Sequence, residues 1–404
     1  MYDLLKGLRV VEGAAFIAGP SCGLHLAQMG ADVIRFDTIG GGPDFKRWPL
    51  APNGFSFYWE GLNKGKKSVA LDLASPRGRE LAVAIAAAPG DNAGMFVTNY
   101  PLDGFLSYEK LKAARSDIIC VRVTGWADGS PAMDYTVHAA SGLPHLTGPV
   151  GASDPINQVL PAWDLLTGAH AAFALMAAER ARRATGEGRD IRMPLSDMVA
   201  STLSHIGMVG EALSQGGDRE RVGNGIFGAF GRDFVTADGE RLMLVAISVK
   251  QWRGALSALG LSDEVAALEA ELGVSFARDE SLRYVHRDRL YPLFERAVAQ
   301  RSLTELGQAF DASGVTWSKY QTTHEAVTAD RRLFADNPIF QTMTGPTGVA
   351  YPASGPAASF IGLERLPMSP APRLGQHTDE VLANVLGLSA GAIGKLHDEG
   401  VVAS

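Results

Sequence analysis

Short apolar runs alternate with helical patterns over the first third of the chain. Residues 8–13 have the pattern of a buried strand, residues 18–30 have helical spacing, and residues 31–37 return to a strand pattern. A strand, a helix and a strand within about thirty residues indicate a βαβ unit with parallel strands and a right-handed crossover. The same alternation predicts strands at 68–73, 95–99 and 118–125, and helices at 76–88 and near 108–115. The pattern predicts an α/β fold with an open parallel sheet, which binds ligands at the carboxyl ends of its strands.

A long, largely apolar helix is predicted from residue 159 to about residue 180, with Asp164 in its opening turn. Pro161 suits the first turn, where its missing N–H group leaves no hydrogen bond unmade. The free N–H groups and the helix dipole favour an anion at Asp164 by roughly 0.3–1 kcal/mol. A reference pKa of about 3.9 predicts a charged carboxylate at neutral pH. Taken alone, the pattern fits an aspartate that only caps a helix.

A different pattern begins near residue 196. Four glycines fall within residues 223–231, a spacing that lets the backbone move or approach a ligand closely, and a hairpin is predicted with its turn at 237–239. The other elements expected are helices at 196–213, 250–260, 283–301 and 303–312, a strand at 315–320, extended segments at 337–373, and helices at 379–388 and 390–398. This half of the chain therefore mixes helices with a small antiparallel element.

Composition narrows the class of protein. With 404 residues the chain exceeds the roughly 250–300 residues at which single cores usually divide, so two domains are expected. The net charge of −7 and the pI near 5.8 argue against nucleic acid or an anionic membrane as a partner. Two cysteines form neither a metal pattern nor a disulfide framework. We find no signal-peptide pattern and no apolar run long enough to span a membrane, so we expect a cytoplasmic protein.

Basic residues cluster near predicted strand ends. Lys64, Lys66 and Lys67 lie just before the strand at 68–73, and two further cations at 46–47 stand beside aromatic residues. Lysine ammonium groups bind phosphates, although a solvated surface is the alternative for such a loop. No Gly-x-Gly-x-x-Gly follows the first strand, so a dinucleotide-binding fold is not indicated.

Seven motifs occur in the order found in one known family. They are residues 8–12 with Ala18-Gly-Pro, 26–35, 62–73, Asn99-Tyr-Pro, Asp164 with its helix, Thr185-Gly-Glu-Gly and Pro372-Arg-Leu-Gly-Gln-His-Thr. Each motif is short, but together they resemble the class III coenzyme A (CoA) transferases over nearly the whole chain. The resemblance implies a Rossmann-like large domain made of residues 1–195 with 325–404, a smaller α+β domain at 196–324, and an interlocked homodimer.

The resemblance also implies a chemistry for Asp164, which occupies the place of the family's catalytic aspartate. Its carboxylate would attack an acyl-CoA thioester to form a mixed anhydride, and CoA would then convert Asp164 into an enzyme thioester. The N–H groups at the start of its helix would hold the oxyanion. CoA enters as part of the substrate, and the resemblance implies no permanently bound cofactor and no metal.

Three segments, 39–49, 225–234 and 396–400, resemble the subgroup that moves CoA between the C1 and C4 carboxyl groups of one mesaconate molecule. Two departures from simpler family members accompany them. The glycines that would close over the site are spaced, as Gly225, Gly228 and Gly231, rather than consecutive. Ile17 stands where those transferases have glutamine, so a methyl-bearing dicarboxylate would meet an apolar surface.

Further site residues follow from basic character, position in loops and the family resemblance. The residues expected to bind CoA are Ala18, Arg47, Lys64, Lys67, Asn99 and Tyr100. The residues expected to meet the acyl group are Ile17, Tyr135, His138, His145 and Arg232. Tyr135 lies in a polar turn, where a turn cap is an equal alternative. Arg232 is expected to meet the far carboxylate of a dicarboxylic acid.

Three alternatives remain open. An intermolecular class III CoA transferase for a dicarboxylic acid, with a succinyl-CoA type donor, would share every motif. An α-methylacyl-CoA racemase shares the fold, but it needs a histidine directly before the aspartate at the position of Met133-Asp134. A non-catalytic CoA- or nucleotide-binding protein is less consistent with the intact surroundings of Asp164.

Overall fold

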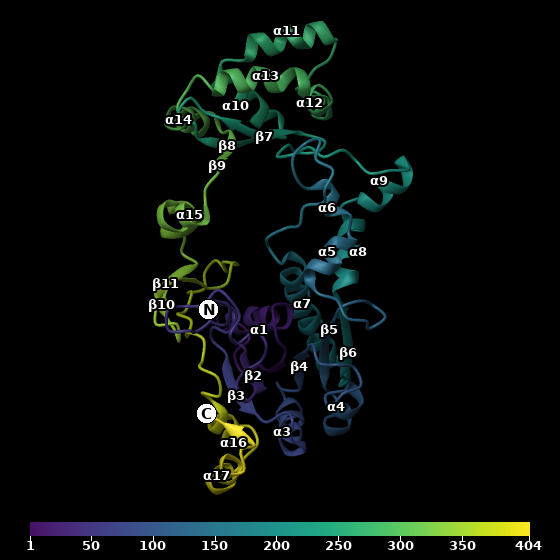
Figure 1. Ribbon diagram of the computed structural model, residues 1–404, viewed down its shortest axis with the longest axis vertical. Coiled ribbons are helices and arrows are strands. Elements are labelled where there is room, and N and C mark those ends of the chain that lie inside the picture. The colour runs from purple at the N-terminus through teal and green to yellow at the C-terminus, as the bar shows by residue number, and fades with distance from the viewer. The chain divides into compact units, whose positions relative to one another are not determined.

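The computed structural model describes residues 1–404, which form two compact units (Figure 1). Unit 1 comprises residues 1–141, 158–214 and 336–404, and unit 2 comprises residues 142–157 and 215–335. The chain passes between the two units after residues 141, 157, 214 and 335. The loop at 142–157 joins unit 2 because Arg221 donates hydrogen bonds to four of its carbonyl oxygens, from Pro144 to Asp154.

A seven-stranded sheet forms the centre of unit 1, in the order β12-β3-β2-β1-β4-β5-β6. Its strands are β1 (Arg9–Gly13), β2 (Asp32–Thr38), β3 (Lys67–Leu71), β4 (Met95–Thr98), β5 (Ile119–Thr124), β6 (Arg189–Pro194) and β12 (Val402–Ala403). All neighbours pair in parallel except β12, which runs antiparallel to β3. The predicted α/β fold with an open parallel sheet is confirmed, and the chain reverses direction across the sheet between β1 and β4.

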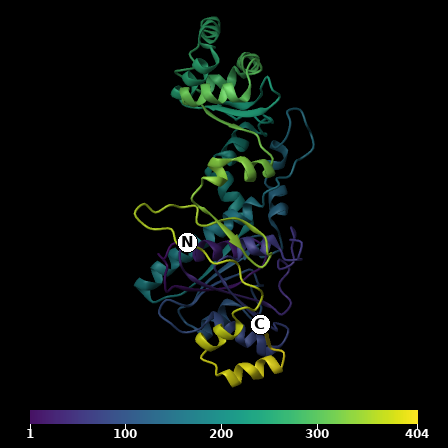
Figure 2. The ribbon, with the colours of Figure 1, turned by 90° about the vertical axis from the view of Figure 1, so that its left-hand side faces the viewer.

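Helices cover both faces of this sheet. The helices of unit 1 are α1 (Ala18–Gln28), α2 (Phe57–Leu62), α3 (Pro76–Ala86), α4 (Tyr108–Ala114), α5 (Asp134–Ala140), α7 (Ala162–Thr185), α8 (Leu195–His205), α9 (Met208–Gln215), α16 (Thr378–Asn384) and α17 (Ala390–Asp398). Of these, α9 buries no residue and does not cover the sheet. Successive strand residues face opposite sides, so Val10 packs with α1 and α7 while Val11 packs with α3, α4, α16 and α17. Figure 2 shows the yellow C-terminal helices beside the purple-to-blue N-terminal elements, which fits this shared core.

Two helices predicted as continuous are each broken in the structure. The helix expected at 196–213 divides into α8 and α9 because Gly207, with φ of +83°, adopts a left-handed conformation that ends α8. The helix expected at 283–301 divides at His286 into α12 (Ser281–Val285) and α13 (Arg287–Val298). The periodicity of apolar residues continues across both breaks and does not reveal them.

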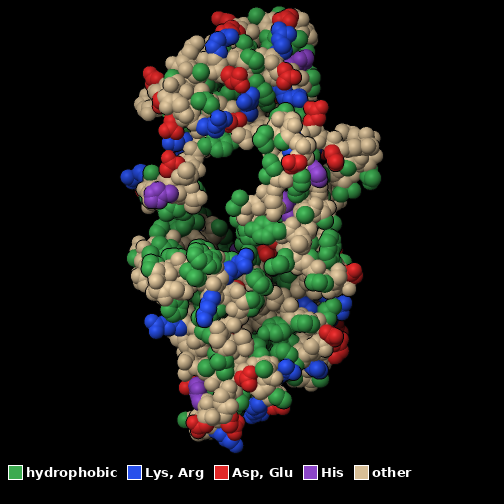
Figure 3. All heavy atoms as spheres, in the orientation of Figure 1, with side chains coloured by type: hydrophobic (Ala, Val, Ile, Leu, Met, Phe, Trp, Pro, Cys, Tyr) green, Lys and Arg blue, Asp and Glu red, His purple; other side chains and the backbone are tan.

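Unit 2 is built on a three-stranded antiparallel sheet, in the order β7-β8-β9. Its elements are α6 (Leu143–Leu146), β7 (Phe230–Val235), β8 (Arg241–Ala246), α10 (Val249–Leu259), α11 (Ser262–Leu272), α12, α13, α14 (Leu303–Ser313), β9 (Thr316–Lys319), α15 (Thr323–Ala329) and η1 (Arg331–Ala335). The predicted hairpin at 237–239 joins β7 to β8. Acidic and basic side chains are interspersed over α11 and α13 (Figure 3), where Arg289 pairs with Glu271.

The tail predicted as extended segments contains a second hairpin that the sequence pattern missed. Strands β10 (Phe340–Thr344) and β11 (Ala350–Ser354) pair antiparallel within unit 1. The tail is fixed to α2 by Glu60, whose Oε2 accepts a hydrogen bond of 2.8 Å from the Thr347 N–H group. None of the helices combines the length and apolar character that a membrane crossing requires.

The two helices nearest the candidate chemistry, α1 and α7, meet at Gly168. A Cβ atom on Gly168 would lie 1.8 Å from Ser21 Oγ and 2.7 Å from the Ala18 carbonyl oxygen. Only glycine permits this approach, because the Ala18 contact is with backbone. The position of Asp164, one turn earlier on α7, is therefore set against the first turn of α1.

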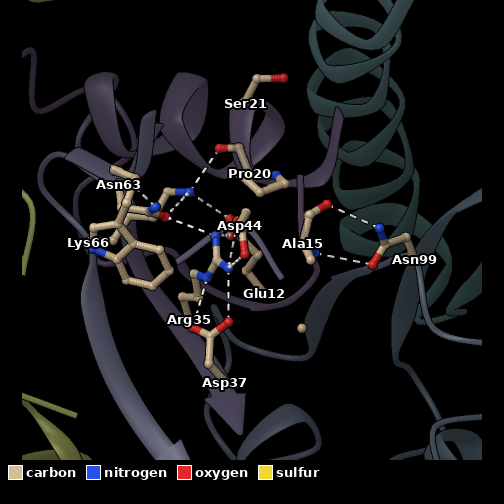
Figure 4. A network of polar contacts seen from close by, with 12 residues as sticks. Glu12, Ala15, Pro20, Ser21, Arg35, Asp37, Asp44, Asn63, Lys66 and Asn99 are labelled. Carbon is tan, nitrogen blue, oxygen red and sulfur yellow. Dashed lines mark hydrogen bonds and ion pairs between the residues drawn. The ribbon is translucent and has the colours of Figure 1, made fainter. Parts of the chain in front are cut away.

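Beneath the β1–α1 turn lies a fully buried network of charged side chains (Figure 4). Lys66 Nζ lies 2.8 Å from Glu12 Oε2 and also donates to the Pro20 carbonyl oxygen in α1. Arg35 contacts Asp37 at 2.8 Å and Asp44 at 2.9 Å. Because Asp44 lies in the loop after β2, the network ties that loop, β1 and α1 together.

Removing one partner from this network leaves a buried charge without compensation. We predict that Glu12→Ala lowers the free energy of unfolding by about 3–5 kcal/mol, measured by urea denaturation. The control is Glu80→Ala, which breaks an exposed pair with Arg77 and should change stability by about 0–1 kcal/mol. A Glu12→Ala protein as stable as the control would contradict this reading of the network.

Candidate active site

Asp164 lies in the first turn of α7 but does not cap that helix. The cap is supplied by Asp134 at the start of α5, whose Oδ2 accepts hydrogen bonds from the N–H groups of Trp163 (2.7 Å) and Asp164 (3.0 Å). Asp134 is buried, and its second oxygen, Oδ1, has no hydrogen-bond partner. The side chain of Asp164 is thus left free for other chemistry.

The environment of Asp164 corrects the expectation of an ordinary ionised carboxylate. Its pKa is raised to about 7, mainly by burial and also by the charge of Asp134, while the charge of Arg47 acts in the opposite direction. Asp164 therefore exchanges its proton near neutral pH. The α7 N–H groups expected to hold an oxyanion are also occupied, since those of residues 163 and 164 donate to Asp134.

A cavity of about 720 Å³ opens beside Asp164, at the carboxyl ends of β1, β4 and β5. Its lining comprises residues 15–18 of the β1–α1 turn, 99–103 after β4, 123–125 at the end of β5, 128–133, Asp164 and Leu195. This is the edge of the sheet, beside the reversal between β1 and β4, where open α/β folds bind ligands. Four predicted site residues other than Asp164 line it, namely Ile17, Ala18, Asn99 and Tyr100.

The β1–α1 turn in this lining is held in an unusual conformation. Phe16 has φ of +68°, in the left-handed region that side-chain-bearing residues rarely adopt. Asn99 holds the turn with two hydrogen bonds to Ala15, accepting from its N–H at 3.2 Å and donating to its carbonyl oxygen at 3.1 Å (Figure 4). The amide of Asn99, predicted to contact CoA, is thus engaged with protein while the residue itself lines the cavity.

Arg47 and Tyr58 lie on the Phe16 side of this site. The guanidinium carbon of Arg47 is 5.8 Å from the centre of the Phe16 ring and 5.4 Å from that of Tyr58. The Tyr58 hydroxyl is buried without a hydrogen-bond partner, and burial raises its pKa. The sequence did not single out Tyr58, because its place among aromatic residues at 57–59 is typical of core.

Two residues predicted to meet the acyl group lie on α5. His138 is buried, and its Nδ1 accepts a hydrogen bond of 3.2 Å from Trp163 Nε1, whereas its Nε2 has no partner. Burial lowers the pKa of His138, which favours the neutral ring. The Tyr135 hydroxyl donates to the Val159 carbonyl oxygen at 3.1 Å. Neither residue lines the cavity at Asp164.

The remaining predicted residues have partners elsewhere. Lys64 Nζ donates to the Ser354 carbonyl oxygen at 3.1 Å, and Lys67 pairs with Asp32 and Glu380 at 3.0 and 3.1 Å. Lys67 lines a second cavity of about 500 Å³, together with Arg373 and His377 among others. Within unit 2, the His145 carbonyl oxygen accepts from Arg221, and Arg232 pairs with Glu295 at 2.9 Å. Their roles toward CoA or the acyl group stay predictions.

A family model described as CoA-transferase family III matches residues 5–378 of the chain. The chain belongs to CoA-transferase family III. The family predicted from the sequence motifs is thereby confirmed. Asp164 lines the cavity expected for a ligand, and its role as the acyl- and CoA-bearing residue stays a prediction.

Two similar proteins carry names that refer to 2-methylfumaryl-CoA and to succinyl-CoA and glutarate. The chain is 48% identical over 404 residues to the 2-methylfumaryl-CoA isomerase of Chloroflexus aurantiacus, covering 100% of this chain and 98% of that one. It is 28% identical to a succinyl-CoA:glutarate CoA-transferase of Mus musculus, covering 98% and 90% of the two chains. A crystal structure of a CAIB/BAIF family protein from Brucella suis superposes with a TM-score of 0.75 at 25% identity, covering 94% and 99%.

The raised pKa of Asp164 predicts how activity depends on pH. Only an ionised carboxylate can act as a nucleophile, so the predicted role of Asp164 requires kcat/KM to rise with pH up to about 7. Asp134→Asn keeps a carbonyl oxygen for the helix cap but removes the charge beside Asp164. The rise of kcat/KM on the acidic side of the pH profile (the acidic limb) should therefore move to lower pH. Asp197→Asn, an exposed change on α8, should leave the limb in place. An unmoved limb in Asp134→Asn would show that the two carboxylates are not coupled.

The same shift predicts an effect on stability. In the folded chain Asp164 keeps its proton up to a pH of about 7, whereas in the unfolded chain it loses it near the ordinary value of about 3.9. Its contribution to stability is therefore present at pH 4 and is lost as the pH rises to 7. We predict that Asp164→Asn raises the melting temperature more at pH 8 than at pH 4.5. Equal changes at both pH values would count against the shift.

Proposed function

We propose that this protein moves CoA between the C1 and C4 carboxyl groups of mesaconate, with Asp164 as the covalent carrier. The observation that carries the proposal is the Asp164 carboxyl at the edge of a cavity at the carboxyl ends of the strands, freed from helix capping by Asp134. Similarity along the full length to a 2-methylfumaryl-CoA isomerase supplies the substrate.

The first half of the reaction transfers the acyl group and then CoA to the protein. The Asp164 carboxylate attacks the thioester carbonyl carbon, the C–S bond breaks, and CoA leaves as a thiolate, which produces a mixed anhydride. The thiolate then attacks the Asp164 carbonyl carbon, and the C–O bond to the acyl group breaks. Asp164 now carries CoA as a thioester, and mesaconate is free but still bound.

The second half repeats these steps with the other carboxyl group. That carboxylate attacks the Asp164 thioester and displaces CoA thiolate, and the thiolate attacks the new acyl carbon to release the Asp164 carboxylate. No second acid is required. The raised pKa of Asp164 suits both halves, because a more basic carboxylate is a better nucleophile and its proton exchanges near neutral pH.

The tetrahedral intermediates need hydrogen-bond donors other than those of α7. The start of α1 also lies in the cavity, with Ile17 and Ala18 in the lining and no side chain capping it. We assign the oxyanion to these N–H groups. We also expect the chain to form an interlocked homodimer, as the family resemblance implies, and to act in the cytoplasm.

A racemase is disfavoured by a specific residue. The position directly before Asp134 is Met133, whose side chain carries no proton that a base could exchange. An intermolecular transferase uses the same steps but releases the acid, so only an exchange experiment separates it from internal transfer.

Supplying free acid during turnover tests the proposal. Incubation with mesaconyl-C1-CoA and isotopically labelled mesaconate should convert the C1 thioester to the C4 thioester without label in the product. A C4 thioester labelled to the same extent as the added mesaconate would indicate intermolecular transfer. If the wild-type protein makes no C4 thioester while remaining folded, the proposal is wrong. Asp164→Ala should abolish conversion in the same assay.

A further inference from the structure

Arg47 is a cation in the candidate active site that has no ionic partner in the protein. Its guanidinium lies over two aromatic rings, 5.8 Å from the centre of Phe16 and 5.4 Å from that of Tyr58. No carboxylate lies within 4.0 Å of it, in contrast to Lys66 and Lys67, which are both paired. Stacking on aromatic rings orients a guanidinium while leaving the donors along its edge available.

Arg47 lies on the side of the cavity formed by Phe16, the same cavity that Asp164 lines. Phe16, under the guanidinium, lines the same cavity as Asp164. The charge of Arg47 lowers the pKa of Asp164, yet the two groups form no ion pair. The guanidinium is therefore not used up in an ion pair with Asp164 and can bind another anion.

The charges of the cavity show what such a molecule needs. Three aspartates, residues 103, 128 and 164, line the cavity, and no lysine or arginine does. An acyl group with a second, ionised carboxyl would meet only like charges there, and an anion leaving water needs a compensating partner. Arg47 is the cation that acts on Asp164, so it is the group suited to bind that second carboxylate.

We propose that Arg47 binds the free carboxylate of the acyl group while the other carboxyl reacts at Asp164. The assignment rests on the proposed function, because only a dicarboxylic acyl group has such a second carboxylate. It replaces the expectation that Arg47 binds a CoA phosphate. A guanidinium accepts a carboxylate through two parallel hydrogen bonds, and Arg47 would hold C4 before the transfer and C1 after it. Arg47 thus holds mesaconate in the site while Asp164 carries CoA and mesaconate has no covalent bond to either.

Equilibrium binding separates this role from catalysis. The protein used is Asp164→Asn, which cannot form the anhydride, and calorimetric titration compares mesaconyl-C1-CoA with tiglyl-CoA, in which a methyl group replaces the free carboxylate. Mesaconyl-C1-CoA should bind about 50-fold more tightly. Adding Arg47→Met should erase that preference by weakening only the dicarboxylic ligand. Arg47→Lys should retain part of it, since an ammonium keeps the charge but not the paired geometry.

The same comparison extends to the other isomer and to a matched control. Mesaconyl-C4-CoA and its methyl counterpart, 3-methylcrotonyl-CoA, should behave like the first pair. Lys46→Met removes an equal charge from the adjacent position and should leave the preference unchanged, since it is Arg47 that stacks on the Phe16 and Tyr58 rings.

Two results would overturn the assignment. In the first, Arg47→Met binds mesaconyl-C1-CoA and tiglyl-CoA more weakly by the same factor, but binds their dephospho-CoA counterparts as tightly as the parent does. Arg47 would then be a ligand of the CoA phosphate. The other is no preference for the dicarboxylic ligand in the Asp164→Asn parent, or a preference that survives Arg47→Met. Failure of the proposed function appears separately, as wild-type protein without isomerisation, because these titrations require no turnover.

Discussion

Two carboxyl groups meet at the first turn of α7, and the chemistry of the site depends on that contact. Asp134 takes the two N–H groups that would otherwise stabilise an anion at Asp164. Asp164 is left partly buried, beside a like charge, with a pKa of about 7. The arrangement opposes stability, because a carboxylate held this way would be more favourably placed in water. It favours nucleophilic attack, because the carboxylate is more basic than an ordinary aspartate.

The rest of unit 1 holds this unfavourable arrangement in place. Gly168 lets α7 approach α1 so closely that their backbones fix each other's position. Asn99 holds the β1–α1 turn from β4, and the buried network around Arg35 and Lys66 holds it from β2 and β3. The left-handed conformation of Phe16 is maintained by these contacts, as expected where strain is stored near a functional site. These contacts thus fix the β1–α1 turn and α7 around the cavity, where Asp164 is held near the like charge of Asp134.

Local patterns in the sequence were sufficient for strands β1 to β5 and for the position of Asp164. The strands at the centre are apolar runs, and the helices between them have clear periodicity, so both followed from residues close in the chain. Strand β6 was missed because it is an edge strand with charged residues, Arg189 and Arg192, that lacks an apolar signal. The hairpin at 340–354 was missed because its strands lie among prolines and glycines.

The chemistry of the site depends on contacts between distant parts of the chain, which local patterns do not contain. The ionisation of Asp164 is set partly by Asp134, thirty residues earlier in the chain. The lysines near residue 65 seemed available for phosphate, but their partners, such as Glu12 and Ser354, lie far away in sequence. Arg47 was singled out for its charge, and only the structure relates that charge to Asp164.

The central claim is that Asp164 becomes covalently bonded to CoA through its side-chain carbonyl carbon. Borohydride reduction of the protein during turnover with mesaconyl-CoA, followed by peptide mass spectrometry, tests it directly. The account predicts that residue 164 is converted from aspartate to homoserine, only when the acyl-CoA is present. An unmodified Asp164 in protein that is turning over, or reduction at a different residue, would contradict it.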